Sequence, residues 1–139
     1  MNSKKYKTPN SWKELILLLD YLSYCPPKFL RLSEDENFYS LFRELVPKKV
    51  SLEIVNRLIG NNDRVILKNN FPYSKVLKRL KNVEHYCLWS KKGKLNNNQI
   101  KKEVERKFGK CNWCYSERKL NKKSVPEIWH CHIFINHEF

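Results

Sequence analysis

The sequence contains little glycine and no long apolar run. Its 139 residues include three glycines and neither a GxxxxGK nor a GxGxxG pattern, which excludes a glycine-rich phosphate loop. The longest apolar stretch, residues 15–19, is far shorter than the roughly 18 residues of a membrane-spanning helix. The N-terminal MNSKKYKTPNSWKE has no apolar core, so no secretory signal and no membrane partner are expected. Five cysteines, an odd number, then favour reduced thiols and a cytoplasmic location.

Acidic residues are also scarce. The chain has 28 Lys and Arg against 14 Asp and Glu, a net charge of +14. Residues 64–123 alone hold 18 basic and 4 acidic residues, so the excess lies in less than half of the chain. A clustered positive charge indicates an anionic partner such as nucleic acid, a nucleotide phosphate or an acidic protein surface. A lysine-rich surface without a partner remains the simpler alternative.

Residues 10–60 are predicted to form a helical part. Ser11, followed three residues later by Glu14, is typical of a capped helix start, and Pro26 with Pro27 ends that first helix. The helix is therefore expected over residues 12–24.

Two more helices are expected before residue 60. Ser33 repeats the start signal and Pro47 ends the second helix, whose apolar residues have helical spacing and are expected in the core. These residues are Phe38, Leu41, Phe42 and Leu45. A third helix is predicted over residues 52–59, with Ser51 as its N-cap and Gly60 just past its end.

Residues 61–139 are predicted to form a sheet part. Alternating and β-branched runs indicate strands, and one basic amphipathic stretch indicates a helix between them. The strands are expected at residues 64–68, 83–89, 112–115 and 128–135, and the helix at 98–108. We therefore predict one domain, residues 1–139, of α+β class: an antiparallel sheet preceded by an N-terminal helical segment.

The last predicted strand carries two histidines on one face. Because alternate residues of a strand share a face, Ile128, His130, His132 and Phe134 are expected on one side, and Trp129, Cys131, Ile133 and Ile135 on the other.

Three segments of the sheet part resemble known proteins. RVILKNNFPY, VEHYCLWSKK and SVPEIWHCHIFI follow the layout of histidine-triad nucleotide-binding proteins over about residues 62–135. Over about residues 10–139, the same segments more closely resemble a domain family of fungi and viruses that includes the fungal N-acetylglucosamine-induced protein and has no assigned function. The triad resemblance implies a histidine-triad-like sheet, nucleotide binding, a histidine nucleophile on the last strand, and a homodimer.

Triad proteins carry three alternating histidines where this chain has two. If His130 matches the first of them, His132 matches the nucleophile and Phe134 replaces the third. If His130 matches the nucleophile, Ile128 replaces the first. The sequence leaves both alignments open, with His132 as first choice of nucleophile and His130 as second. Ser90 stands where the family has a proline.

Two imidazoles at this spacing suit chemistry at a phosphate. They would lie about 6–7 Å apart on one strand face, so that one can attack phosphorus while the other donates to a phosphate oxygen or to the leaving group. The candidate phosphate ligands are Ser124, Lys122, Lys123 and Asn69. The leading prediction is a nucleotide- or RNA-phosphate-binding protein, with nucleotidyl hydrolysis or transfer as its possible reaction. Phosphate binding without chemistry and a strand face without a role are the alternatives.

A non-catalytic, basic nucleic-acid-binding protein is an alternative from another class. Basic residues near aromatic residues are typical of surfaces on which bases stack and phosphates bind. The candidates are Lys91, Lys92, Lys94, Lys101, Lys102 and Arg106. For each residue taken alone, the simplest interpretation is a solvated surface side chain.

A zinc-stabilised interaction module is the second alternative. Cys111 and Cys114 form a C-x₂-C pair, followed by His130 and His132, and two thiolates with two imidazoles can bind zinc tetrahedrally. The H-x-H interval differs from that of zinc fingers, so the leading prediction includes no cofactor. Cys87 and Cys131 are interpreted as core residues.

Overall fold

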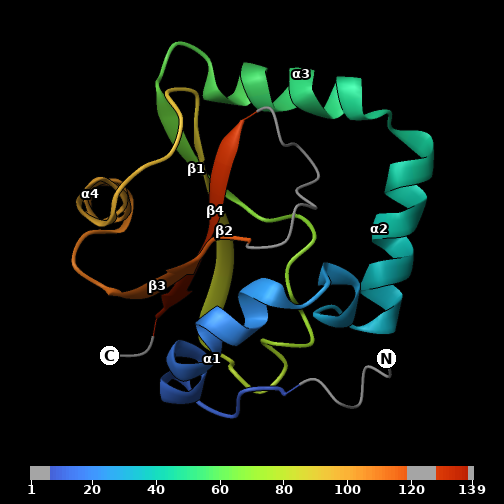
Figure 1. The fold of residues 1–139 in the computed structure, drawn as a ribbon, viewed down its shortest axis with the longest axis vertical. Coiled ribbons are helices and arrows are strands. Elements are labelled where there is room, and N and C mark those ends of the chain that lie inside the picture. The colour runs from blue at the N-terminus through green and yellow to red at the C-terminus, as the bar shows by residue number, and fades with distance from the viewer. Residues whose placement is uncertain (1–6, 119–127, 138–139) are drawn as a thin grey trace.

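A four-stranded antiparallel sheet with helices on both faces organises the described part of the chain (Figure 1). The structure is a computed structural model that describes residues 7–118 and 128–137. The helices are α1 (Trp12–Tyr24), the short 3₁₀ helix η2 (Pro27–Phe29), α2 (Ser33–Leu45), α3 (Lys48–Ile59) and α4 (Asn97–Phe108). The strands are β1 (Arg64–Lys68), β2 (Val83–Ser90), β3 (Asn112–Ser116) and β4 (Trp129–Asn136), in the order β1-β2-β4-β3.

The predicted α+β class is confirmed, with a helical segment preceding an antiparallel sheet. Each predicted strand is present, and each begins and ends within one residue of its expected position. No helix among the described residues has the length and apolar character needed to cross a membrane.

Side-chain caps set where α1 and α4 begin. Ser11 Oγ accepts the backbone N–H of Glu14 at 3.2 Å, as the sequence predicts. The Glu14 carboxylate, however, accepts the N–H of Asn10 and not that of the cap residue. At α4 the exchange is reciprocal: Asn96 Oδ1 accepts the Gln99 N–H, and Gln99 Oε1 accepts the Asn96 N–H, both at 2.9 Å. This capping box satisfies two backbone groups of Asn96 and Gln99 at the helix start.

The expected starts of α2 and α3 are wrong by a few residues. Ser33 is the first residue of α2 and not its cap. The helix α3 begins at Lys48, with Pro47 as N-cap, because proline supplies the required φ and its missing N–H costs nothing at a helix start. Ser51 therefore lies inside α3, where its hydroxyl accepts a hydrogen bond from Arg43 at 2.7 Å.

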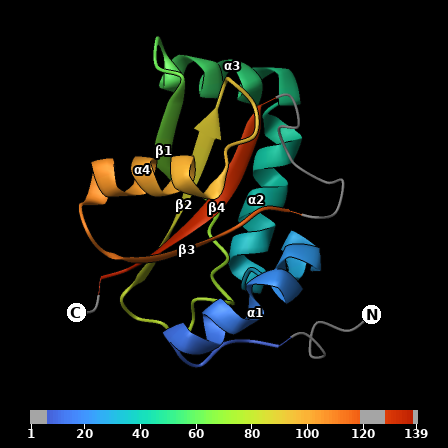
Figure 2. The same ribbon diagram turned by 60° about the vertical axis from the view of Figure 1, so that its left-hand side comes forward.

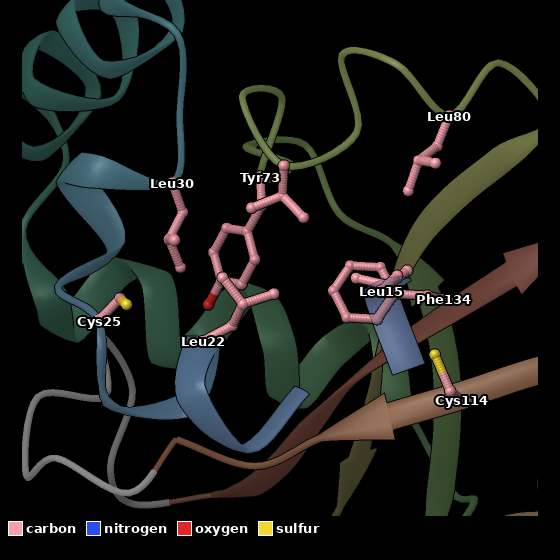
Figure 3. Close-up of a cluster of buried hydrophobic side chains, with 9 residues drawn as sticks. Leu15, Leu22, Cys25, Leu30, Tyr73, Leu80, Cys114 and Phe134 are labelled. Carbon is pink, nitrogen blue, oxygen red and sulfur yellow. The ribbon is translucent and has the colours of Figure 1, made fainter. Parts of the chain in front are cut away.

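Each face of the sheet has its own apolar cluster. On one face, α1 packs Leu15 and Leu22 against Phe134 of β4 and Cys114 of β3, and Figure 3 shows Tyr73 beside Leu30 and Leu22. On the other face, the α4 residues Ile100 and Val104 pack with Ile66, Leu88, Cys131, Ile133 and Ile135. Figure 2 shows α4 lying across the strands on that second face. The predicted alternation along β4 is confirmed, because Phe134 and Cys131 belong to different clusters.

The expectation that α2 buries its apolar residues is wrong. Phe38, Leu41 and Leu45 are 63%, 51% and 71% exposed, and no residue of α2 is buried. Its aromatic contacts come from Phe38, Tyr39 and Phe42, whose rings lie 5.8, 5.1 and 4.9 Å from that of Phe71. Helical periodicity identifies an apolar face, but it does not establish that another element covers that face.

Asn96→Ala should lower the free energy of unfolding by about 1 kcal/mol, because it removes the side-chain acceptor at the start of α4. Asn98→Ala is the matched control, since Asn98 is exposed in the first turn of the same helix. Urea denaturation followed by circular dichroism measures both variants. Equal losses in the two variants would contradict a capping role for Asn96.

Candidate functional site

The pairing of β2 with β4 gathers three buried histidines on the face turned toward α1, α2 and α3 (Figure 1). Cys87 lies opposite His132, and Trp89 lies opposite His130. Because alternate residues share a face, His85 lies on this side as well, next to Cys87. The histidines come from two strands, and sequence spacing alone does not bring them together.

His85 and His132 form a hydrogen-bonded pair whose tautomers are fixed by their partners. His85 Nδ1 accepts the backbone N–H of Tyr73 at 3.1 Å, so the neutral ring carries its proton on Nε2. This Nε2 lies 2.8 Å from His132 Nδ1, which accepts the proton. His132 then carries its own proton on Nε2, 3.2 Å from the Tyr73 hydroxyl oxygen. The chain of hydrogen bonds thus begins and ends at Tyr73.

Burial keeps this cluster uncharged. Loss of hydration lowers the pKa of His85 to about 3, with a smaller effect of the Arg31 charge, and lowers the pKa of His132 well below its usual value. Burial also raises the pKa of Tyr73 and that of Cys87 to about 12. Around neutral pH the two imidazoles, the phenol and the thiol are therefore all neutral.

These residues are arranged for hydrogen bonding and not for metal binding. Within residues 7–118 and 128–137, His85, Cys87 and His132 are the one group of three or more His, Cys, Asp or Glu residues whose ligand atoms all lie within 4.8 Å of one another. A metal-binding imidazole offers a lone pair and donates its other N–H to an acceptor. His85 cannot do so in this orientation, because its Nδ1 faces an N–H donor and its Nε2 holds the proton.

The structure does not bring together the alternative zinc set of Cys111, Cys114, His130 and His132. Cys114 packs with the apolar cluster on the α1 side of the sheet, whereas Cys111 packs against the cluster on the α4 side. Residues three positions apart in an extended chain point to opposite faces, so this C-x₂-C pair cannot converge on one ion. In a zinc finger, a turn brings the two sulfurs together.

His130 is held differently from His132. Its Nδ1 lies 3.3 Å from the carbonyl oxygen of Ile128, and because a carbonyl can only accept, Nδ1 carries the proton. The lone pair of the neutral ring is then on Nε2. The Trp89 ring stacks on this imidazole with 4.2 Å between centroids, which fixes the orientation of the ring.

A pocket of about 210 Å³ opens between this face of the sheet and the helices α2 and α3. His130, His132, Cys87 and Trp89 contribute from the sheet, and none of the described residues that line it is acidic. The cations of its lining are Arg31, Arg43 and Lys68.

These three cations differ in how far they are already neutralised. Arg31 pairs with Glu36 at 3.0 Å, and Lys68 pairs with Glu84 at 2.8 Å. Arg43 has no carboxylate within 4.0 Å among the described residues, and its buried Nε lacks a hydrogen-bond partner there. Arg43 is therefore the cation with most capacity for an anionic ligand.

Of the four predicted phosphate ligands, only Asn69 lies in the described part of the chain. Asn69 lies at the pocket, but its amide is used internally: Oδ1 accepts the Phe71 N–H at 2.8 Å, and Nδ2 donates to Cys87 Sγ at 3.5 Å. Ser124, Lys122 and Lys123 lie outside the described residues.

The predicted nucleic-acid contacts are all exposed and do not line the pocket of the histidines. Lys91, Lys92 and Lys94 follow β2, and Lys101, Lys102 and Arg106 belong to α4, on the opposite face of the sheet. Three of the six have local partners: Lys91 donates to the Gly60 carbonyl, Lys101 pairs with Glu105, and Arg106 pairs with Glu103.

Sequence reasoning missed His85 and interpreted Cys87 as core only. The alternation His85, Cys87, Trp89 along the second predicted strand places all three on one face, so a face-by-face comparison of the two strands could have grouped them. Arg31 and Arg43 carried no such signal, because only the packing of α2 and α3 brings them to the pocket.

Comparisons with protein-family models, with curated proteins and with solved structures find no match for this chain.

Acidification from about pH 7.5 to about pH 5 should destabilise the fold by about 2 kcal/mol through His85 alone. The pKa of His85 falls from 6.5 in the unfolded chain to about 3 when buried, so only the unfolded state gains a proton in this interval. The contribution of His85 to stability is therefore fully present well above pH 6.5 and is lost progressively as the pH drops toward 3. Urea denaturation at the two pH values measures the difference.

In His85→Gln, most of the contribution of His85 to the pH dependence of the free energy of unfolding should be lost. In His137→Gln this contribution should remain, because His137 is exposed. The comparison concerns the pH dependence of each variant and not its absolute stability. A His85→Gln protein with the full wild-type pH dependence would show that His85 is not a buried neutral ring.

Proposed function

We propose that the chain binds the phosphate of a nucleotide or of an RNA end in the pocket between β4 and the α2–α3 pair. The supporting observation is the chemistry of the lining, in which three cations and two imidazoles meet and none of the described residues is acidic. Guanidinium and ammonium groups are the usual protein donors to phosphate oxygens. Arg43, with an unsatisfied buried Nε, is the proposed main phosphate ligand.

The dimensions of the pocket favour the phosphate over the complete nucleotide. Its volume of about 210 Å³ lies below the roughly 300–1,000 Å³ of pockets that enclose a whole small molecule. A phosphoryl group, with part of a sugar, is therefore the portion that enters. The remainder of the ligand stays at the mouth, where the apolar residues Ile54 and Leu58 lie exposed.

His130 is the proposed nucleophile if the site is catalytic. The Ile128 carbonyl holds the proton on Nδ1, so Nε2 is the nitrogen that would attack phosphorus. His132 is less suited, because one nitrogen accepts from His85 and the other faces the Tyr73 hydroxyl. Its proposed role is structural: it fixes the neighbouring part of the sheet face beside His130.

The proposed reaction is a substitution at phosphorus in two steps. Nε2 of His130 forms a bond to the phosphorus as the bond to the leaving oxygen breaks, and the leaving group departs as a phosphate anion. Water then attacks the phosphorus and releases a proton to solvent, and the N–P bond breaks with its electron pair returning to Nε2, which regenerates the imidazole. The net result is hydrolysis of one phosphoanhydride into two phosphate products.

His130→Gln should lower turnover of a dinucleotide polyphosphate, a nucleotide sugar or capped RNA by about a hundredfold or more, because it removes the attacking lone pair. Chromatographic separation of the products measures turnover. His137→Gln is the control, since His137 is exposed just beyond the end of the same strand. Turnover that persists in His130→Gln would exclude His130 as nucleophile.

Arg43→Gln should weaken binding of a nucleotide by about ten- to a hundredfold, because it removes a charged donor from the pocket. Arg79→Gln is the matched control: Arg79 is exposed, lies outside the pocket and carries the same charge. Isothermal titration calorimetry at fixed salt gives both affinities. Equal weakening in the two variants would contradict a phosphate site in the pocket.

Binding of nucleic acid through the exposed basic residues is a second candidate function, supported by the exposure of all six predicted residues. Its signature is salt-sensitive RNA binding that survives His130→Gln and Arg43→Gln but is lost when Lys92, Lys94 and Lys102 are all replaced by Gln.

A further inference from the structure

The helices α2 and α3 present large apolar side chains that no described residue covers. Six such side chains are between 40% and 71% exposed: Phe38, Leu41 and Leu45 on α2, and Val50, Ile54 and Leu58 on α3. A monomeric protein rarely exposes so many neighbouring apolar groups, and a patch of roughly several hundred Å² usually marks an interaction site.

The two apolar rows face the same side of the molecule. The helices α2 and α3 form the two arms of an L (Figure 1). Residues of both helices line the pocket together with residues of the sheet, so the pocket-lining side of each helix faces the inside of the L. At about 100° per residue, the exposed row of α2 is rotated away from the pocket-lining Tyr39 and Arg43. The row of α3 continues from the pocket-lining Ile54 and Leu58 to Val50, and so is turned away from Ser51 and Val55 in the same sense of rotation. The rows therefore project on one side of the plane of the L and form a joint face.

We propose that this α2–α3 face binds a second copy of the chain. A two-fold axis that bisects the L places α2 of one copy antiparallel on α3 of the other, and the reverse pair forms at the same time. Counted from the corner at Pro47, the apolar residues then meet in three layers. Leu45 meets Val50 of the partner subunit, Leu41 meets Ile54 of the partner subunit, and Phe38 meets Leu58 of the partner subunit.

The charges of the two helices fit this antiparallel arrangement. Helix α2 carries four carboxylates and one arginine, whereas α3 carries three basic residues and one acidic residue. Near the corner, Glu44 comes opposite Lys49 of the partner subunit. At the far end, Glu34 lies about one turn beyond Phe38, so that its long side chain can extend toward Arg57 of the partner subunit. Complementary flanking charges fix register and orientation.

The distribution of charge along the whole chain also favours contact through these helices. Residues 12–60 carry seven basic and seven acidic residues, whereas residues 61–139 carry eighteen basic and seven acidic residues. Contact through the neutral helical part leaves the strongly positive sheet parts away from the interface. Contact through the sheet parts would instead bring like charges together. The proposal does not depend on the proposed function of the pocket.

Sedimentation equilibrium of the full chain tests this interface. We expect a concentration-dependent dimer, and we expect Leu41→Glu to raise its dissociation constant about 30-fold or more, because a carboxylate would lie in the central apolar layer. Leu17→Glu on α1 is the matched control, since Leu17 is 74% exposed and lies outside the α2–α3 face. A wild-type chain that stays monomeric at about 200 μM, or a dimer weakened equally by both substitutions, overturns the proposal.

Charge reversal tests the antiparallel pairing in a way that misfolding cannot imitate. Glu44→Lys and Lys49→Glu should each weaken the dimer about three- to tenfold, because each places like charges opposite one another in both symmetry-related pairs. The double variant should restore a dissociation constant near that of the wild type. If the double variant loses as much dimer affinity as the two single losses combined, this pairing is wrong.

Discussion

The antiparallel pairing of β2 with β4 is the constraint on which the site depends. This pairing brings His85 and Cys87 beside His132, and Trp89 beside His130, on one face of the sheet. A shift of the pairing by one residue would turn every side chain of one strand to the opposite face. Apolar packing opposes such a shift, because Leu88 and Cys131 would then leave the cluster beneath α4.

Burial gives the two neighbouring histidines of β4 different roles. His132 lies between His85 and Tyr73, where each ring nitrogen has a partner within the cluster. His130, two residues earlier, has its Nδ1 proton held by a backbone carbonyl and its ring stacked on Trp89. The first arrangement fixes the position of a neutral ring inside the protein. The second defines which nitrogen of His130 carries the proton, in a ring that lines a pocket with three cations.

The sequence predicted the strands closely and the site incompletely, for physical reasons that differ. Alternation in 128–135 identifies the two faces of β4, because a buried strand must separate its two sets of neighbours. The same logic cannot reveal that His85 Nδ1 accepts the Tyr73 N–H, since this contact joins a strand to a turn. Nor can periodicity show that Leu41 and Leu45 remain exposed, because it describes one helix and not its surroundings.

The pocket and the apolar face of α2 and α3 share residues, and this links the two proposals structurally. Ile54 and Leu58 line the pocket and also belong to the exposed row of α3. A second copy seated on that row would border the pocket mouth, where the part of a ligand beyond its phosphate must lie. Such a ligand would then contact both copies, and its binding would favour the dimer by its differential affinity for the paired state. The cations of the pocket lining and the apolar row of α3 would thus contact different parts of one bound molecule.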